Sequence, residues 1–122
     1  MNWESLKINQ MSKARFEIKR SRDKQFYFVL VAPNNEVIGT SETYKQRGGC
    51  KTGIESVITN ALKHNYAVKR AKNGQFFFNL IAGNGKVILT SETYVNLFGL
   101  GVGADAVNKY CTQAEVVDLT NI

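Results

Sequence analysis

The stretch QFYFVLVAPNNEVIGTSETY, at residues 25–44, returns fifty residues later as QFFFNLIAGNGKVILTSETY, at residues 75–94. The similarity runs without a gap between Phe16–Ala61 and Tyr66–Cys111, and more than a third of the paired positions are identical. Similarity at one fixed spacing indicates an internal duplication. Two copies are too few for a solenoid, so the sequence predicts two similar units related by a pseudo-twofold axis.

Each copy has the pattern of three short strands joined by tight turns. The strands are FEIKR, QFYFVLVA and EVIGTSETY in the first copy, and YAVKR, QFFFNLIA and KVILTSETY in the second. The dipeptides Asn73-Gly74 and Asn84-Gly85 are typical of hairpins, because both residue types tolerate the positive φ of a type I′ turn. Three antiparallel strands joined in this order form a meander.

The second strand of each copy indicates which face of the meander points into the core. Four apolar residues alternate along this strand and are the same in both copies, whereas Val29 on the opposite face is replaced by Asn79. We therefore expect the unchanged face to be buried and Asn79 to face water. The predicted core residues are Phe26, Phe28, Leu30, Ala32, Phe76, Phe78, Leu80 and Ala82.

After each meander the apolar residues follow the spacing of an amphipathic helix. The stripe is formed by Cys50, Ile54, Val57, Ile58 and Ala61 in the first copy, and by Leu100, Ala104, Val107 and Cys111 in the second. The second helix also contains Gly99, Gly101 and Gly103. Each glycine in a helix interior costs about 1 kcal/mol relative to alanine, so we expect this helix to begin late or to fray.

The predicted fold class is α+β, with a β-β-β-α module repeated in tandem and an extra C-terminal strand from AEVVDLT at residues 114–120. We expect two three-stranded layers, each covered by its own helix. The predicted organisation is a flexible extension at residues 1–15, a first repeat at 16–65, and a second repeat with the added strand at 66–122. Both repeats are expected to form one compact unit, and Trp3 to be exposed or to pack on a partner.

The composition restricts the chemistry that the protein can perform. The chain has two cysteines, Cys50 and Cys111, and one histidine, His64. These residues do not form the closely spaced groups of a zinc site, so we predict no metal and no cofactor, and two buried cysteines in a reducing compartment. No apolar run approaches the roughly 20 residues that cross a bilayer, and the first residues lack a signal-peptide pattern. We expect a cytoplasmic protein without a membrane partner.

The repeated TSETY segment admits a structural and a chemical interpretation. At the end of a strand, short hydroxyl side chains satisfy loose backbone N–H groups and a tyrosine closes the edge of the core. Alternatively, the pseudo-twofold axis brings Glu42 and Glu92 together as a pair of catalytic acids. No histidine recurs beside a serine or threonine, which favours the structural interpretation. The residues concerned are Thr40, Ser41, Glu42, Tyr44, Thr90, Ser91, Glu92 and Tyr94.

The net charge is +6, and basic residues recur at equivalent places. They lie at the ends of the two predicted first strands and in the turns that follow, where two symmetric basic hairpins could contact a phosphate backbone. The simpler interpretation is a charged edge that prevents aggregation between strands. The candidate anion or nucleic-acid contacts are Lys19, Arg20, Arg22, Lys69, Arg70 and Lys72.

Two further patterns give weaker signals. GLGVG at residues 99–103 resembles a glycine-rich phosphate loop, but it falls within a predicted helix of an antiparallel module and lacks the dinucleotide-binding spacing. The aromatic strands QFYF and QFFF are also typical of sheets that stack nucleic-acid bases. Because the other phenylalanines are predicted to be in the core, only Tyr27 and Phe77 remain as candidates for such stacking.

Several segments together resemble the YegP-like proteins, which are small bacterial and archaeal proteins with one or two β-β-β-α modules. These segments are NGQFFFNLIAGNGKVILTSETY (Asn73–Tyr94), GIESVITNA (Gly53–Ala61) and EVVDLT (Glu115–Thr120), and the resemblance covers residues 16–120. It implies a two-copy member with no agreed catalytic residue. Single-copy relatives are expected to pair, so the duplication implies a monomer that fuses such a dimer into one chain.

This chain departs from the family pattern at three places. Lys24 and Asn35 stand where the second copy has the turn glycines Gly74 and Gly85. The helix signature GIESV is replaced in the second copy by GADAV, at residues 103–107, which predicts altered packing of that helix.

The sequence favours a non-catalytic binding or interaction module whose partner is unknown. Nucleic-acid binding through the basic hairpins is the main alternative, and a small enzyme with a site between the repeats is a further one. The partner is therefore expected to be another protein or a nucleic acid.

Overall fold

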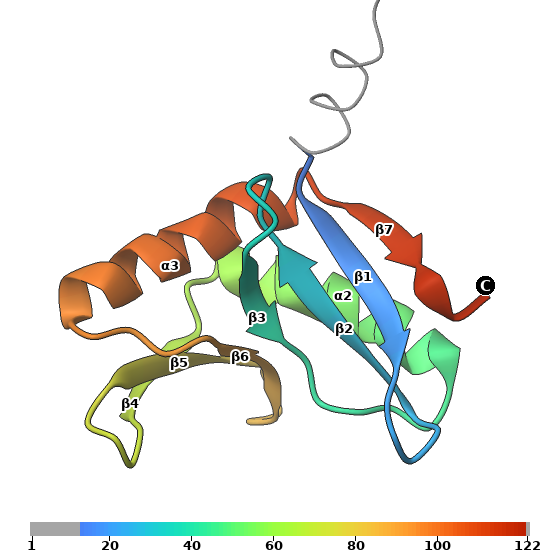
Figure 1. Ribbon diagram of the computed structural model, residues 1–122, viewed down its shortest axis with the longest axis horizontal. Helices are drawn as coiled ribbons and strands as arrows, with labels where there is room; N and C mark the ends of the chain where they lie inside the picture. The colour runs from blue at the N-terminus through green and yellow to red at the C-terminus, as the bar shows by residue number, and fades with distance from the viewer. Residues whose placement is uncertain (1–12, 122) are drawn as a thin grey trace, which may run out of the picture.

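The computed structural model describes residues 13–121, and these form one curved sheet with two long helices (Figure 1). The expectation for Trp3 lies outside the described residues. The first repeat contains β1 (Arg15–Arg20), β2 (Phe26–Val31), β3 (Val37–Thr40) and α2 (Arg47–Leu62). The second repeat contains β4 (Tyr66–Arg70), β5 (Phe76–Ile81), β6 (Val87–Ser91) and α3 (Leu97–Cys111), followed by β7 (Glu115–Asp118) and the 3₁₀ helix η1 (Leu119–Asn121). The predicted class, α+β with two β-β-β-α modules and an added strand, is confirmed.

The two meanders join into a single sheet, so the expectation of two separate layers is wrong. The strand order is β4-β5-β6-β3-β2-β1-β7. At the junction β3 and β6 are antiparallel, with Thr40 opposite Thr90 and Gly39 opposite Ser91. The first threonine of each TSETY segment therefore lies at the pseudo-twofold axis.

Gly39 shows how the two repeats differ at this junction. Its equivalent in the second repeat is Leu89, and a Cβ atom at Gly39 would lie 2.8 Å from Leu89 Cγ. Leu89 is fully buried. One leucine therefore occupies the space at the axis that two symmetric side chains could not share.

The sheet edges are unequal because only one of them receives the C-terminal strand. β7 pairs in parallel with β1, with Phe16 opposite Val116 and Ile18 opposite Asp118. Glu115 N donates a hydrogen bond to Ala14 O at 3.3 Å, so the ladder extends one residue before β1. At the other end of the strand order, β4 is paired on one side only within the described residues.

Both helices begin at equivalent positions, Arg47 and Leu97, so the expected late start of α3 is wrong. Asn96 caps α3, since its Oδ1 accepts a hydrogen bond from Gly99 N at 2.8 Å. Such a cap contributes about 1 kcal/mol and offsets part of the helix propensity that the glycines lose. Gln46, at the equivalent position before α2, makes no such side-chain bond.

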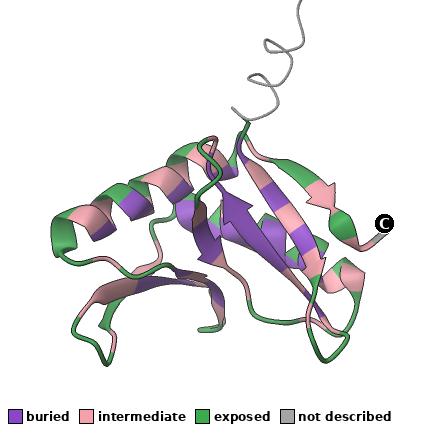
Figure 2. Cartoon of the chain, in the orientation of Figure 1, coloured by how far each residue is buried: buried purple, intermediate pink, exposed green. Residues whose placement is uncertain are grey.

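The predicted core face is confirmed, because all eight predicted residues lie in or against one continuous apolar cluster. Phe28, Leu30, Phe78 and Leu80 are fully buried, and β2 is the most buried strand (Figure 2). Asn79 does not face water as predicted: only 4% of it is exposed. Its Nδ2 donates to Thr90 Oγ1 at 2.9 Å, which satisfies the buried amide.

The hairpin turns adopt a different geometry from the predicted type I′. Gly74 and Gly85 have φ values of 84° and 85°, but Asn73 and Asn84 do not have positive φ. A single left-handed residue after a tight turn is typical of a type I turn with a bulge. Lys24 and Asn35 hold the same conformation in the first repeat, with φ values of 67° and 70°.

Candidate functional site

The serine of each TSETY segment connects two strands through its hydroxyl group. Ser41 Oγ accepts from Phe28 N at 2.9 Å and donates to Glu42 O at 2.7 Å. Ser91 makes the equivalent bonds to Phe78 N and Glu92 O, at 2.9 and 2.8 Å. Each hydroxyl group thus donates one hydrogen bond to the backbone and accepts another from it.

The tyrosine of each segment packs between the sheet and a helix. Tyr44 stacks on Phe28 with ring centroids 6.3 Å apart, and Tyr94 stacks on Phe78 at 6.4 Å. Each hydroxyl lies so close to the helix that a Cβ atom at Gly53 or Gly103 would overlap it. Burial raises the pKa of both tyrosines above the ordinary value.

The structure does not bring Glu42 and Glu92 together. Because β3 and β6 run antiparallel from the pair Thr40–Thr90, the two glutamates follow the strands in opposite directions. Glu92 N donates to Ile38 O at 3.4 Å, on the far side of the junction from Glu42. Four residues of strand, or roughly 13 Å, therefore separate the two positions along the sheet.

The candidate basic residues lie at the ends of β1 and β4 and in the two turns that follow these strands. The β1–β2 turn, with Arg22, and the β4–β5 turn, with Lys72, lie toward opposite ends of the longest axis of the molecule (Figure 1). The arginine before each turn covers an aromatic ring: Arg20 Cζ is 4.8 Å from the Phe26 centroid, and Arg70 Cζ is 4.7 Å from that of Phe76. The two turns thus share a geometry but form no continuous surface with each other.

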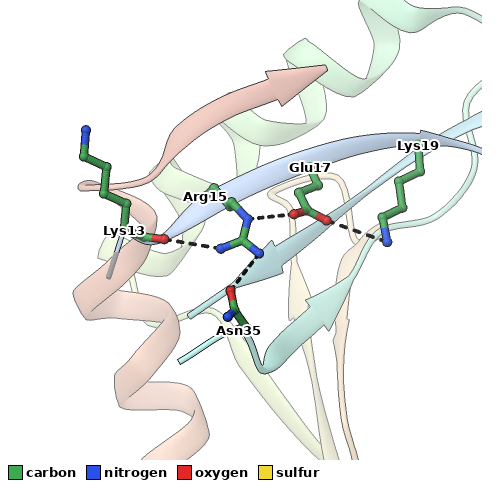
Figure 3. A network of polar contacts seen from close by, with 5 residues as sticks. All are labelled: Lys13, Arg15, Glu17, Lys19 and Asn35. Carbon is green, nitrogen blue, oxygen red and sulfur yellow. Dashed lines mark hydrogen bonds and ion pairs between the residues drawn. The ribbon is translucent and has the colours of Figure 1, made fainter. Parts of the chain in front are cut away.

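The lysines of the two first strands have different surroundings. Figure 3 shows Glu17 between Arg15 and Lys19, with ion-pair distances of 2.6 and 3.7 Å, and Arg15 also reaching Asn35. Ala67 occupies the position equivalent to Glu17, so Lys69 lacks this acidic neighbour on its own strand. Lys69 consequently has no counterpart of the Lys19–Glu17 ion pair on its own strand.

Two grooves lie between the repeats, each formed by the helix of one repeat and a hairpin turn of the other. The first groove, about 350 Å³, is lined by α3 at Gly103 and by the β2–β3 turn at Glu36. The second groove, about 370 Å³, is lined by α2 at Gly53 and by the β5–β6 turn at Lys86. The sequence admitted a site between the repeats, but it did not indicate that each helix would also face a hairpin turn of the other repeat. Their charges differ, since Glu36 and Lys86 are equivalent residues.

The start of α3 carries exposed apolar side chains, which we call the helix-start patch. Phe98 is 83% exposed and Val95 is 78% exposed, and Leu97 and Val102 are also exposed. The equivalent residues of the first repeat are Lys45, Arg47, Gly48 and Thr52. Sequence reasoning missed this patch, although the change from polar to apolar residues between aligned positions was visible.

The remaining titratable groups offer no metal site or activated thiol. Within residues 13–121, no three His, Cys, Asp or Glu side chains gather closely enough to hold a metal ion. Burial raises the pKa of the Cys50 thiol to about 11 and also raises that of Cys111. His64 contacts Asn108 Nδ2 through Nδ1 at 3.1 Å.

Comparison with known proteins places both repeats in one family. A family model described as "Domain of unknown function (DUF1508)" matches residues 21–66 and again residues 71–118. The chain belongs to this family. The resemblance to YegP-like proteins is confirmed, because the UPF0339 protein YegP of Yersinia pestis is 40% identical over 58 residues, covering 48% of this chain and 52% of that protein.

Other relatives also match over less than half of this chain. A UPF0339 protein of Shewanella oneidensis is 52% identical over 46 residues, or 38% of this chain and 42% of that protein. One from Treponema denticola is 47% identical over 47 residues, covering 38% of this chain but 81% of its own length. The matched segments thus span about half or less of the first two relatives, and most of the third.

Solved structures match over nearly the whole described fold. The solution NMR structure of YegP from E. coli, described as a protein of unknown function, has a TM-score of 0.82 and 38% identity, covering 88% of this chain and 93% of that one. The structure of a UPF0339 protein from Shewanella oneidensis has a TM-score of 0.80 and 39% identity, covering 88% of this chain and 92% of that one.

In the part of the chain that the structure describes, no helix is both long and apolar enough to cross a membrane.

Proposed function

We propose that the protein is a non-catalytic binding module that contacts its partner through the second repeat. The observation that carries the proposal is the helix-start patch of Val95, Leu97, Phe98 and Val102. Contiguous exposed apolar side chains on a soluble domain mark interaction surfaces. The first repeat has the same backbone here but presents Lys45 and Arg47, so the fold itself does not require the patch.

The polar groups of the repeated segment support a non-catalytic role. The Ser41 and Ser91 hydroxyls are bonded to the backbone, and burial raises the pKa of Tyr44 and Tyr94. An activated nucleophile requires the opposite, a free group with a base beside it or a lowered pKa.

Two buried thiols with raised pKa values also fit a reducing compartment, and we assign the protein to the cytoplasm. Because the repeats already complete a pseudo-dimer, we assign it as a monomer.

The test exchanges the patch for the residues of the first repeat. The triple variant Val95→Lys, Leu97→Arg and Phe98→Gly should fold as the unaltered chain does and should lose the proteins that the unaltered chain captures. Captured proteins are identified by mass spectrometry after crosslinking in cells of the organism that encodes the chain, with nuclease treatment of each sample. The matched control replaces exposed first-repeat residues at equivalent positions, Lys45 and Thr52, with alanine. An identical set of captured proteins with the triple variant would refute the proposal.

Nucleic-acid binding is a second candidate, favoured by the two arginines held over Phe26 and Phe76 beside exposed basic turns. In this case the β1–β2 turn and the β4–β5 turn would each bind the nucleic acid separately, because the two turns are far apart (Figure 1). If about four phosphates are contacted, the affinity for a single-stranded RNA should fall with salt at a log–log slope of about −3. Lys19→Ala combined with Lys69→Ala should weaken retention, and absence of retention at low salt would exclude this function.

A further inference from the structure

The two outer strands of the repeats are equivalent, but only one has a neighbour on its outer side. β1 pairs on that side with β7, the chain's own C-terminal strand. β4 lies at the end of the strand order, and its outer edge is not paired with any strand among residues 13–121. The chain thus displays, on its first repeat, how an added strand binds to this module.

Side-chain exposure shows what the added strand covers. Ile18 on β1 is completely buried, whereas its equivalent Val68 on β4 is 55% exposed. Phe26 is buried and Phe76 is only partly so. The core face of the second repeat therefore stays partly open where β7 and η1 close the first.

The backbone of β4 is oriented to accept a further strand. Ile81 N donates to Asn65 O at 2.9 Å, so the carbonyl of Asn65 points toward β5. Because hydrogen-bonding groups alternate along an antiparallel strand, the N–H and C=O groups of Tyr66, Val68 and Arg70 point away from β5. A parallel strand would use these groups except the N–H of Tyr66, which already donates to His64 O at 2.9 Å.

We infer that the outer edge of β4 binds an extended segment of a partner protein, which adds a parallel strand as β7 does on β1. This inference rests on the proposed function and identifies the partner by its chemistry. In the first repeat the start of α2 reaches the added strand, since Arg47 lies 3.2 Å from Asp118, and the helix-start patch lies at the equivalent start of α3. Strand addition gives affinity through the main chain and specificity through alternate side chains.

The charges and the helix start define the composition of this segment. We call residues 114–120, which include β7, the tail. In the first repeat, Asp118 of the tail pairs with Arg47 at 3.2 Å. Leu97 replaces Arg47 in the second repeat, so the partner segment carries an apolar residue where the tail has Asp118. Lys69, Arg70 and Lys72 are exposed around the edge, which favours acidic residues elsewhere in the segment.

The test uses two synthetic peptides. One has the tail sequence AEVVDLT, and the other is AEVVLLT, with leucine at the position of Asp118. We expect AEVVLLT to bind about tenfold more tightly, because it places an apolar side chain against Leu97. In a titration followed by the backbone amide signals of the full chain, shifts should concentrate in β4 and the start of α3. The Leu97→Arg variant should prefer AEVVDLT, whereas Asp105→Asn, an exposed change farther along the same helix and outside the patch, should leave the preference unaltered.

Methylation of single peptide nitrogens tests the strand register. Glu115 N donates to Ala14 O, so in the tail the N–H of Val117 points to β1 and that of Val116 points away. N-methylation at the second valine of the peptide should abolish binding to β4, whereas N-methylation at the first should not. Equal loss from both would refute a parallel strand in this register.

Three further outcomes would overturn the inference. The first is absence of any shift of the amide signals at about 1 mM peptide. The basic residues around β4 would then serve only to prevent aggregation at the sheet edge. The second is shifts in the grooves or in β1 instead of β4. The third is a concentration-dependent dimer that protects the Val68 amide, because the occupant would then be a second copy. If the peptides fail but the triple variant still loses its captured proteins, this inference fails and the proposed function stands.

Discussion

Lys24 holds a left-handed backbone conformation, φ 67°, that Gly74 holds in the second repeat. This conformation costs a residue with a Cβ atom about 1–2 kcal/mol, and glycine avoids most of it at some cost in chain entropy. We predict that Lys24→Gly stabilises the protein by about 0.5–1 kcal/mol in urea unfolding. Asp23→Gly, one residue earlier and without positive φ, is the control and should be neutral or destabilising. Equal effects from both would contradict a role for backbone strain.

The residues of the core could be predicted one by one, and those of the junction could not. Phe28 and Phe78 recur unchanged on an alternating face, and alternation alone orients a strand. Asn79 was placed wrongly because alternation tells which face a residue occupies but not whether that face is covered. The complementary pair Gly39 and Leu89 involves a contact between repeats, which an alignment of the repeats with each other does not contain.

At the scale of the helix, Gly103 and Gly101 have opposite roles although both lie in α3. A Cβ atom at Gly103 would overlap the Tyr94 hydroxyl, whereas nothing lies within 4 Å of one at Gly101. We predict that Gly103→Ala destabilises the protein by about 1–3 kcal/mol through overpacking, and that Gly101→Ala stabilises it by about 0.5–1 kcal/mol. Thermal unfolding followed by circular dichroism measures both. Destabilisation by Gly101→Ala would show that α3 requires a glycine for a reason other than the space beside Tyr94.

At the scale of strand β7, one carboxylate holds the end of the tail. The Thr120 hydroxyl and backbone N–H lower the pKa of Asp118 below 3.8, with a smaller contribution from Arg47. Because the folded pKa is lowered, the stabilisation is present above the unfolded value and is lost as the pH falls through the folded pKa. We predict that Asp118→Asn is less stable than the unaltered chain at pH 7 and that the difference shrinks in acid, as the pH falls below the unfolded pKa and through the folded one.

Urea unfolding at pH 7 and at an acidic pH measures this difference for Asp118→Asn. Asp105→Asn, an exposed change on α3, is the control and should alter stability little at either pH. A difference that persists unchanged into acid would show that the Asp118 contribution is not carried by its charge.

The elements could be predicted from the sequence, but their order in the sheet could not. Hairpin signals and apolar spacing act over a few residues, and each of the predicted strands and both helices is present. The β3–β6 pairing sets Gly39 opposite Ser91 and Thr40 opposite Thr90, and nothing local specifies it. The two grooves depend on this pairing, since it sets the helix of one repeat against the hairpin turn of the other.

At the scale of the whole molecule, the repeats share one core and should unfold together. The apolar cluster includes Leu30 of the first repeat and Leu80 of the second, both fully buried. We predict that Leu30→Ala and Leu80→Ala each destabilise the protein by about 2–5 kcal/mol and that each variant keeps a single unfolding transition. Coincident transitions from amide signals in β2 and β5, followed in urea, provide the measurement. If Leu80→Ala instead unfolded the second repeat while β2 stayed native, the repeats would be independent domains, and the exposed edge of β4 would have to be explained by local unfolding rather than by an absent partner strand.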